Sequence, residues 1–317
     1  MKILVTGAAG FIGYHLCKSL LNDDYEVLGI DSLNSYYDPK LKKDRLKQLE
    51  TYNNFIFEKL NIANYDPLDK VFKSFKPAKV VNLAAQAGVR YSIENPFAYM
   101  ESNLIGFLNI IELCRNKNIN KLIYASSSSV YGNNKKRVFS ENDKIDKPIS
   151  LYGASKAANE LIAYSYSHLY DIHTTGLRFF TVYGPWGRPD MAMFIFTKNI
   201  LDGKHIKVFN NGKMQRDFTF IDDIISGIRL SLDKNYKCEI FNLGNHKMVN
   251  LMDMISIIEN ELKIKAKINF VPLQDGDVVK TLSDIKKSTK KLNYIPSVNI
   301  DEGIRLFIYW YKKFYNI

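Results

Sequence analysis

Residues 6–13 of this chain read TGAAGFIG, and they join an apolar run, KILVT, to the start of a helical pattern. Gly7, Gly10 and Gly13 punctuate this turn with a GxxGxxG spacing rather than the GxGxxG of the common dinucleotide fingerprint. A strand, a glycine turn and a helix in this order direct backbone N–H groups and the positive helix end toward a phosphate. Asp31 ends the next apolar run, EVLGID. A carboxylate there can accept hydrogen bonds from both ribose hydroxyls and repel a 2′-phosphate, so the stretch predicts a site for NAD rather than NADP.

Strand and helix patterns alternate along the first 180 residues. Short β-branched runs such as KVVN and KLIYA are followed by helical periodicity, which predicts helices over 12–22, 39–50, 66–75, 97–116 and 151–169. This repetition predicts an α/β fold, a Rossmann-type doubly wound parallel sheet with helices on both faces. We assign residues 1–180 to an NAD-binding domain and residues 181–317 to a smaller, interleaved nucleotide-sugar-binding lobe. The run IFNLGN is expected to return to the sheet, so a segment near 216–244 belongs with the first domain.

Composition excludes several classes of protein. The chain has 317 residues, 46% hydrophobic and 24% charged, with a formal net charge of +11. The lysine-rich runs KLKKDRLK and DIKKSTKK are interpreted as solvated faces, and no basic–aromatic interleaving suggests nucleic-acid binding. Three scattered cysteines predict neither a disulfide framework nor a metal site, and no run is apolar enough for a membrane span. We therefore expect a cytoplasmic protein with no nucleic-acid, membrane or metal partner.

Tyr152 and Lys156, in YGASK, stand four residues apart on a predicted helix and so share one face. A nearby ammonium, together with a positive nicotinamide ring, is expected to lower the tyrosine pKa from about 10. The phenolate would then accept a proton from a substrate hydroxyl. The YxxxK pattern alone is weak, because many such pairs lie on protein surfaces.

Several further motifs occur together and in order: NLAAQAGVRYS, ASSSSVYG, LRFFTVYGPWGRPDM, RDFTFIDD and QDGDV. With TGAAGFIG and YGASK they resemble, over nearly the whole chain, the extended short-chain dehydrogenase/reductase family of NAD-dependent nucleotide-sugar epimerases and dehydratases. The similarity is greatest to the UDP-glucuronate 4-epimerases. The resemblance implies that the catalytic residues are Tyr152, Lys156 and Ser127. It implies that NAD is bound by Gly7, Gly10, Phe11, Ile12, Gly13, Asp31, Asn61, Ile62, Leu83, Ala84, Ala85, Tyr152 and Lys156. Asn61 departs from the Asp that relatives often use to hold the adenine amino group.

The serine row separates related chemistries. In the family, the position of Ser127 binds the sugar 4-hydroxyl. Sugar 4,6-dehydratases carry an Asp–Glu pair at the next two positions, and related decarboxylases carry a Glu at the second. This chain has Ser128 and Ser129, and hydroxyls are weak acids and bases. Elimination therefore lacks its acid–base pair, whereas reversible oxidation at C4 does not need one.

The resemblance also implies the substrate contacts. Arg188, in a loop that neutral-sugar epimerases do not show, would face a C6 carboxylate, and Arg216 would contact the diphosphate of the UDP moiety. The expected substrate-binding residues are Arg90, Ser127, Ser128, Ser129, Thr181, Arg188, Arg216 and Gln274. We expect interconversion of UDP-glucuronate and UDP-galacturonate through a transient 4-keto sugar, in the service of polysaccharide biosynthesis. Alternatives are a UDP-glucose or UDP-N-acetylglucosamine 4-epimerase, a UDP-glucuronate decarboxylase and a non-catalytic NAD-binding scaffold.

The predicted helices over 97–116 and 151–169 pair into a four-helix dimer interface in the family. Their sequences here, YMESNLIGFLNIIELC and NELIAYSYSHLY, are apolar and aromatic enough for that role. A homodimer is therefore expected, although packing on the sheet accounts for one face of each helix. Asp222 and Asp223 are interpreted as the N-cap and first-turn carboxylates of a helix.

Overall fold

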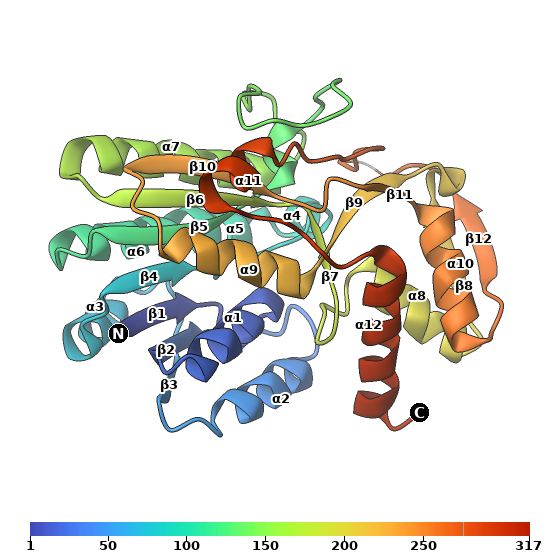
Figure 1. The fold of residues 1–317 in the computed structure, drawn as a ribbon, viewed down its shortest axis with the longest axis horizontal. Coiled ribbons are helices and arrows are strands. Elements are labelled where there is room, and N and C mark those ends of the chain that lie inside the picture. Colours follow the sequence, from blue (N-terminus) through green and yellow to red (C-terminus); the bar gives the residue numbers. More distant parts are fainter. Residues whose placement is uncertain (275) are drawn as a thin grey trace.

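A parallel sheet of seven strands forms the larger part of the structure, a computed structural model that describes residues 1–274 and 276–317 (Figure 1). The strand order is β10-β6-β5-β4-β1-β2-β3. The strands are β1 Lys2–Thr6, β2 Glu26–Asp31, β3 Phe55–Lys59, β4 Lys79–Asn82, β5 Lys121–Ser127, β6 His173–Phe179 and β10 Cys238–Leu243. The order reverses between β1 and β4, which is the point where doubly wound sheets bind ligands. The predicted Rossmann-type fold is confirmed.

Helices cover both faces of this sheet (Figure 1). One face carries α1 Phe11–Asn22, α2 Pro39–Leu49 and α9 Ile221–Leu232, and the other carries α3 Tyr65–Phe75, α6 Gly106–Asn116 and α7 Leu151–Tyr170. Buried apolar side chains form a separate cluster on each face. Every strand of the sheet is parallel to its neighbours, so both faces are buried, as the continuous apolar runs predict.

The second lobe is built around two small sheets on the right of Figure 1. One holds β7 Thr181–Tyr183, β9 Gln215–Phe220 and β11 Met248–Asn250, and the other pairs β8 His205–Phe209 with β12 Lys267–Val271. Its helices are α8 Ala192–Leu201, α10 Leu251–Leu262 and α12 Ile300–Tyr315, and α10 packs on α12. A short helix, α11 Lys286–Leu292, lies against β10.

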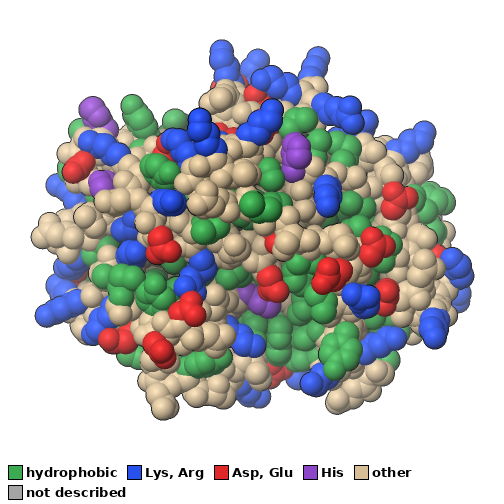
Figure 2. Space-filling view, in the orientation of Figure 1, with side chains coloured by type: hydrophobic (Ala, Val, Ile, Leu, Met, Phe, Trp, Pro, Cys, Tyr) green, Lys and Arg blue, Asp and Glu red, His purple; other side chains and the backbone are tan. Residues whose placement is uncertain are grey.

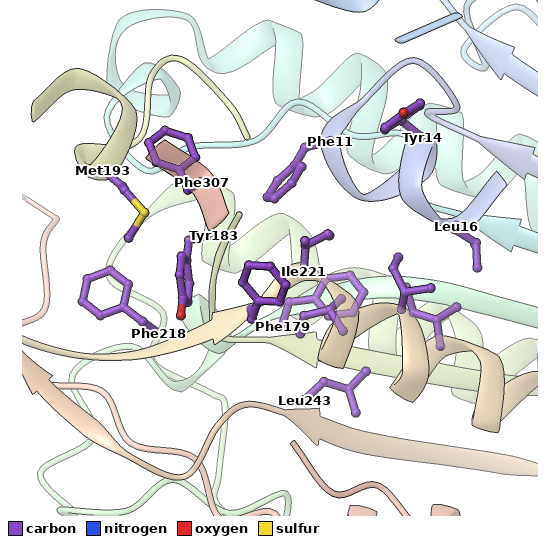
Figure 3. Close-up of a cluster of buried hydrophobic side chains, with 14 of the residues drawn as sticks. Phe11, Tyr14, Leu16, Phe179, Tyr183, Met193, Phe218, Ile221, Leu243 and Phe307 are labelled. Carbon is purple, nitrogen blue, oxygen red and sulfur yellow. The ribbon is translucent and has the colours of Figure 1, made fainter. Parts of the chain in front are cut away.

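One hydrophobic core joins the two lobes. Figure 3 shows Phe11 of α1 and Phe179 of β6 in the same cluster as Met193 of α8 and Phe307 of α12. Strand β10 pairs with β6 in parallel register, so the expected return of IFNLGN to the large sheet is confirmed. Because the core is continuous, the second lobe is held firmly against the large sheet.

The predicted helix over 97–116 is confirmed, and it contains a π-helical turn. The structure has α4 Tyr91–Glu94, α5 Pro96–Tyr99, a π-helical turn at Met100–Ile105, and then α6. The π turn places Asn103 inward, where its side chain accepts from the backbone N–H of Gln86 at 2.8 Å and donates to the backbone oxygen of Gln86 and to Ser155 Oγ, both at 3.0 Å. Turns of this kind are frequent at functional sites. Here it ties the chain after β4 to α7.

The interpretation of the lysine-rich run KLKKDRLK as a solvated face is wrong for two of its residues. Arg45 is fully buried and Lys42 is 6% exposed. Asp222 and Asp223 lie in the first turn of α9, as expected, but the N-cap is Phe220. Figure 2 shows that the lysine and arginine side chains on the visible side of the molecule are spread out rather than gathered in one patch. Among the described residues, no helix combines the length and apolarity needed to cross a membrane.

Candidate active site

A cavity of about 910 Å³ lies between the carboxyl ends of the large sheet's strands and the second lobe. It is lined by every predicted cofactor, catalytic and substrate residue except Gln274. The side-chain oxygen of Gln274 is buried without a hydrogen-bond partner among the described residues. The cavity therefore brings together residues that are distant in the sequence, from Gly7 to Arg216.

The glycine turn at the start of α1 is shaped by close backbone approach. Gly7 has a φ of +72°, and a Cβ atom there would lie 2.9 Å from the backbone nitrogen of Ala84. A Cβ on Gly13 would lie 2.0 Å from the backbone oxygen of Gly7. Gly10 is the N-cap of α1 and has no side chain to cap the first-turn N–H groups. These groups and the helix dipole face the cavity, as a pyrophosphate site requires.

Asp31 ends β2 beside this turn, and Asn61 follows the end of the neighbouring strand β3. Asp31 accepts hydrogen bonds from the backbone N–H groups of Ala9 at 3.2 Å and Leu33 at 2.8 Å. The Asn61 side chain accepts from Ala63 N at 3.0 Å and donates to Glu101 at 2.8 Å. Each side-chain oxygen keeps a lone pair for a ligand. An uncapped helix start, a close backbone approach and a carboxylate at the β2 end together fit a dinucleotide such as NAD.

Tyr152 and Lys156 lie in the first two turns of α7. The helix begins here because Ser150 is its N-cap and accepts from the backbone N–H of Gly153 at 3.0 Å. Lys156 is 3% exposed, and its ammonium donates to the backbone oxygen of Ala125 on β5 at 2.8 Å. Both side chains therefore face the cavity from one side of the helix.

Burial dominates the protonation of this pair. It raises the pKa of Tyr152, while a hydrogen bond from Ser127 and the charge of Arg188 lower that pKa. It also lowers the pKa of Lys156 to about 8. The lowering expected from the ammonium and the nicotinamide ring together stays a prediction; in the protein alone, burial raises the pKa of Tyr152 because the phenolate is poorly solvated. The cation that acts on Tyr152 comes from the second lobe.

The four serines differ in burial and in their partners: Ser126 and Ser127 are buried, and Ser128 and Ser129 are partly exposed. Ser126 is buried and donates to Glu160 at 2.5 Å, and Glu160 forms a buried ion pair with Arg178 at 2.7 Å. Ser127 ends β5, and its hydroxyl accepts from the backbone N–H of Ser129 at 3.1 Å. All four serines line the cavity, but the hydroxyl of Ser126 is already bonded to Glu160. A row of hydroxyls facing a ligand is therefore provided by Ser127, Ser128 and Ser129.

Arg188 lies in the loop after β7 and is paired within the chain. Its Nε and Nη2 atoms donate to Asp190 at 3.0 and 2.5 Å, and the hydroxyl of Tyr36 donates to the same carboxylate at 3.0 Å. All three side chains line the cavity. Asp190 and Tyr36 were not identified from the sequence, although Asp190 stands inside the motif that contains Arg188.

The backbone before Arg188 is held by two residues from the sheet domain. His15 of α1 bonds the backbone oxygen of Pro185 at 2.9 Å. Arg45 of α2 donates to the backbone oxygens of Trp186 at 2.6 Å and Gly187 at 3.3 Å, and to that of Ala9 at 2.8 Å in the glycine turn. Sequence reasoning missed both residues. Helical periodicity could have indicated that Arg45 is buried, because it falls on the same face as the buried leucines of α2.

Two further cationic residues, Arg90 and Arg216, line the cavity. Arg90 pairs with Asp277 at 3.5 Å, and its guanidinium lies 4.7 Å from the ring centre of Phe209. Arg216 donates to the backbone oxygens of Gln215 at 3.0 Å and Val279 at 2.9 Å. Burial lowers its pKa, Asp277 acts against that shift, and Arg90 adds to it. Two guanidinium groups beside one carboxylate suit an anionic ligand.

Comparison with known proteins also indicates a relationship to proteins that bind a dinucleotide and an anionic ligand. Residues 3–244 match the NAD dependent epimerase/dehydratase family. An uncharacterized protein of Methanocaldococcus jannaschii is 54% identical, over 98% of this chain and 96% of its own. UDP-glucuronate 4-epimerase 4 of Arabidopsis thaliana is 46% identical, over 100% of this chain and 76% of its own. The crystal structure of UDP-glucuronic acid 4-epimerase from Bacillus cereus, in complex with UDP-glucuronic acid and NAD, superposes with a TM-score of 0.94 at 37% identity, covering 99% of this chain and 100% of that one.

Proposed function

The chain belongs to the NAD-dependent epimerase/dehydratase family, and from this premise we propose that it interconverts UDP-glucuronate and UDP-galacturonate. The observation that carries the proposal is that Tyr152, Ser127 and Arg188 line one cavity with the dinucleotide-type glycine turn. A proton acceptor, a hydroxyl partner and a cation for a carboxylate are thereby available around a single sugar ring. The enzyme is an NAD-dependent sugar epimerase.

NAD would be held between the glycine turn and the ends of β2 and β3. The first-turn N–H groups of α1 would bind the pyrophosphate, and Asp31 would bind the ribose hydroxyls. When bound, NAD supplies the hydride acceptor and donor for C4 of the sugar, so net redox is zero. Lys156 would donate to the nicotinamide ribose while keeping its bond to Ala125.

Tyr152 is the proposed base for the sugar's 4-hydroxyl, and Ser127 its hydrogen-bonding partner. The phenol of Tyr152 is kept protonated by burial and is helped toward the phenolate by Ser127 and Arg188. In the reverse half of the cycle the same phenol returns the proton to the 4-keto oxygen. One residue thus serves as base and acid, because the reaction has to be reversible at one carbon.

The sugar's acid group needs a firm partner. A 4-keto glucuronate is a β-keto acid, and loss of its carboxylate as carbon dioxide would end the cycle. Arg188 can bind a carboxylate bidentately, and Ser128, Ser129 and Thr181 offer hydroxyl donors at the same cavity wall. None of these three hydroxyls is a strong enough acid or base for elimination chemistry.

The UDP moiety would occupy the part of the cavity that Arg90 and Arg216 line. Arg216 and Arg90 are the proposed contacts for the diphosphate, and the Phe209 ring beside Arg90 offers a face to the uracil. Gln274 does not line the cavity, so the proposal assigns it no substrate contact.

Incubation of the purified protein with UDP-glucuronate, followed by NMR of the nucleotide sugar, tests the proposal. UDP-galacturonate is the expected product, with no net change in NAD absorbance. UDP-xylose or its 4-keto precursor as the main product would instead indicate a decarboxylase. Turnover of UDP-glucose or UDP-N-acetylglucosamine, but not of UDP-glucuronate, would assign a neutral-sugar epimerase. Tyr152→Phe is expected to lower kcat by about 10² to 10⁴, and full activity in this variant would contradict the role of Tyr152.

We also propose a homodimer formed by α6 and α7. Exposed apolar side chains on these helices include Leu108 at 43%, Leu161 at 67%, Tyr164 at 64% and Leu169 at 64%. A patch of this kind favours burial against a second copy. Light scattering after size exclusion should give a dimer for the wild type and a monomer for Leu161→Asp. The control Tyr309→Asp, on an equally exposed ring of α12, should remain dimeric, and a monomeric wild type would contradict the proposal.

A cytoplasmic location completes the proposal. Cys17 and Cys114 are buried and unpaired, and Cys238 is also free. Unpaired thiols suit a reducing compartment. Cell fractionation with an antibody to the protein would place it with cytoplasmic markers, and recovery outside the cell would contradict this location.

A further inference from the structure

The guanidinium proposed to bind the sugar's acid already holds a carboxylate of its own chain. Arg188 Nε and Nη2 both donate to Asp190, in the parallel two-bond arrangement that arginine forms with carboxylates. Burial alone would raise the pKa of Asp190, but the charge and hydrogen bonds of Arg188 lower it below the usual value. The carboxylate is therefore ionised at neutral pH, and it matches the substrate's C6 group in charge and shape.

The pair is fixed from both sides. Tyr36 donates a third hydrogen bond to Asp190 at 3.0 Å. The carbonyls of Trp186 and Gly187, just before Arg188, are held by Arg45. The backbone is thus anchored, while the side chains of Arg188 and Asp190 remain 21% and 27% exposed at the cavity wall. A change of partner needs only side-chain rotation.

Local charge favours an incoming anion. Burial lowers the pKa of Lys42, and so do the positive charges of Arg45 and Arg188, whereas Asp31 raises it. These groups and Asp190 form a cluster of three cations and two carboxylates: Lys42, Arg45, Arg188, Asp31 and Asp190. The C6 carboxylate of a uronate would neutralise the remaining positive charge of this cluster. The C6 hydroxymethyl group of a neutral hexose carries no charge, so Arg188 would stay paired with Asp190.

We propose that Asp190 is the resting partner of Arg188 and is exchanged for the C6 carboxylate of the substrate. This inference rests on the proposed function and names a positioning residue that competes with the acid group for Arg188. A neutral hexose cannot displace Asp190, so it meets a closed pair. When the 4-keto sugar turns over in the cavity, its carboxylate has to leave Arg188, and Asp190 takes the guanidinium back. Arg188 is never left buried without a counter-ion.

Binding measurements separate this exchange from a simple orienting role. UDP-glucuronate and UDP-glucose are titrated calorimetrically into Tyr152→Phe protein, which does not turn them over, with and without Asp190→Asn. Removing the competing carboxylate should tighten UDP-glucuronate by roughly fivefold or more and leave UDP-glucose within about twofold. An unchanged or weaker affinity for UDP-glucuronate would overturn the proposal, because an orienting Asp190 can only help binding.

Kinetics with active protein give the second readout. In Asp190→Asn alone, KM and kcat for UDP-glucuronate should fall together, because the acid group is released more slowly. Asp190→Glu should restore both toward wild type, and Tyr36→Phe should shift KM in the same direction by a smaller factor. Asp202→Asn, on the exposed pair with Lys204, is the charge-matched control and should change neither constant. A raised KM in Asp190→Asn would overturn the exchange, whereas absence of epimerisation by the wild type would overturn only the proposed function.

Discussion

Arg45→Met tests whether the loop that carries Arg188 depends on a buried residue of the sheet domain. Arg45 is fully buried and donates to the carbonyls of Trp186 and Gly187 and, in the glycine turn, of Ala9. Methionine has a similar length and no donor. The substitution therefore removes the connection between the two halves of the cavity while filling most of the space.

The expected loss of stability is about 3 kcal/mol. Each buried carbonyl left without a donor costs roughly 1–3 kcal/mol, and three carbonyls lose theirs. Removing a buried cation returns part of that sum. The functional effect follows from displacement of Arg188, since a shift of about 1 Å in a positioning group can lower the rate by about 10²-fold. KM for UDP-glucuronate should accordingly rise by about tenfold or more.

Urea unfolding and steady-state kinetics measure the two effects. Arg229→Met is the matched control: Arg229 donates to Ser19 and Asp23 and ties α9 to α1 away from the cavity. It should lose about 1 kcal/mol of stability, typical of a partly exposed side chain, and keep the wild-type KM. Equal KM changes in the two variants, or an unchanged KM in Arg45→Met, would refute the positioning role.

Three further predictions concern the framework of the site. Burial lowers the pKa of His15 to about 4, so the unfolded chain binds more protons than the folded protein between pH 6.5 and 4. Acidification over that range should therefore remove about 2 kcal/mol from the free energy of unfolding. His15→Gln should abolish this loss, as measured by urea unfolding at each pH. Glu160→Gln leaves Arg178 buried without a counter-ion and should lower the free energy of unfolding by about 3–5 kcal/mol. The double variant Glu160→Gln/Arg178→Met should recover part of this stability, as measured by calorimetry. Gly13→Ala places a Cβ against the glycine-turn backbone, and NAD content by absorbance should fall by about tenfold or more; unchanged content would contradict the turn's role.

The large sheet could be predicted from sequence because each of its strands carries its own signal. β-branched runs ending in Gly or Asp, followed by helical periodicity, identify β1, β2 and their successors locally. Strands β7, β11 and β12 span three to five residues and exist through pairing with distant segments, such as Met248 with Asp217. The short α11 likewise depends on packing against β10. No local pattern contains that information.

The candidate site divides in the same way. Residues inside ordered motifs, such as Gly7, Tyr152 and Arg188, could be named from sequence and do line one cavity. His15 and Arg45 could not, because each bonds a segment more than 140 residues away. Their chemistry is defined by the carbonyls they meet after folding, and a motif records only neighbours along the chain.

Burial, rather than sequence spacing, sets the acid–base state of the reacting pair. Tyr152 and Lys156 are one helical turn apart, yet burial raises the pKa of the phenol and lowers the pKa of the amine to about 8. Both shifts favour the neutral forms, so an ion pair between them does not form by proximity alone. A permanent positive charge in the cavity lowers the pKa of Tyr152, as the hydrogen bond from Ser127 also does. Arg188 supplies such a charge from the second lobe, and the oxidised nicotinamide ring would add another, so we expect the proposed base, Tyr152, to become more effective when the cofactor is bound.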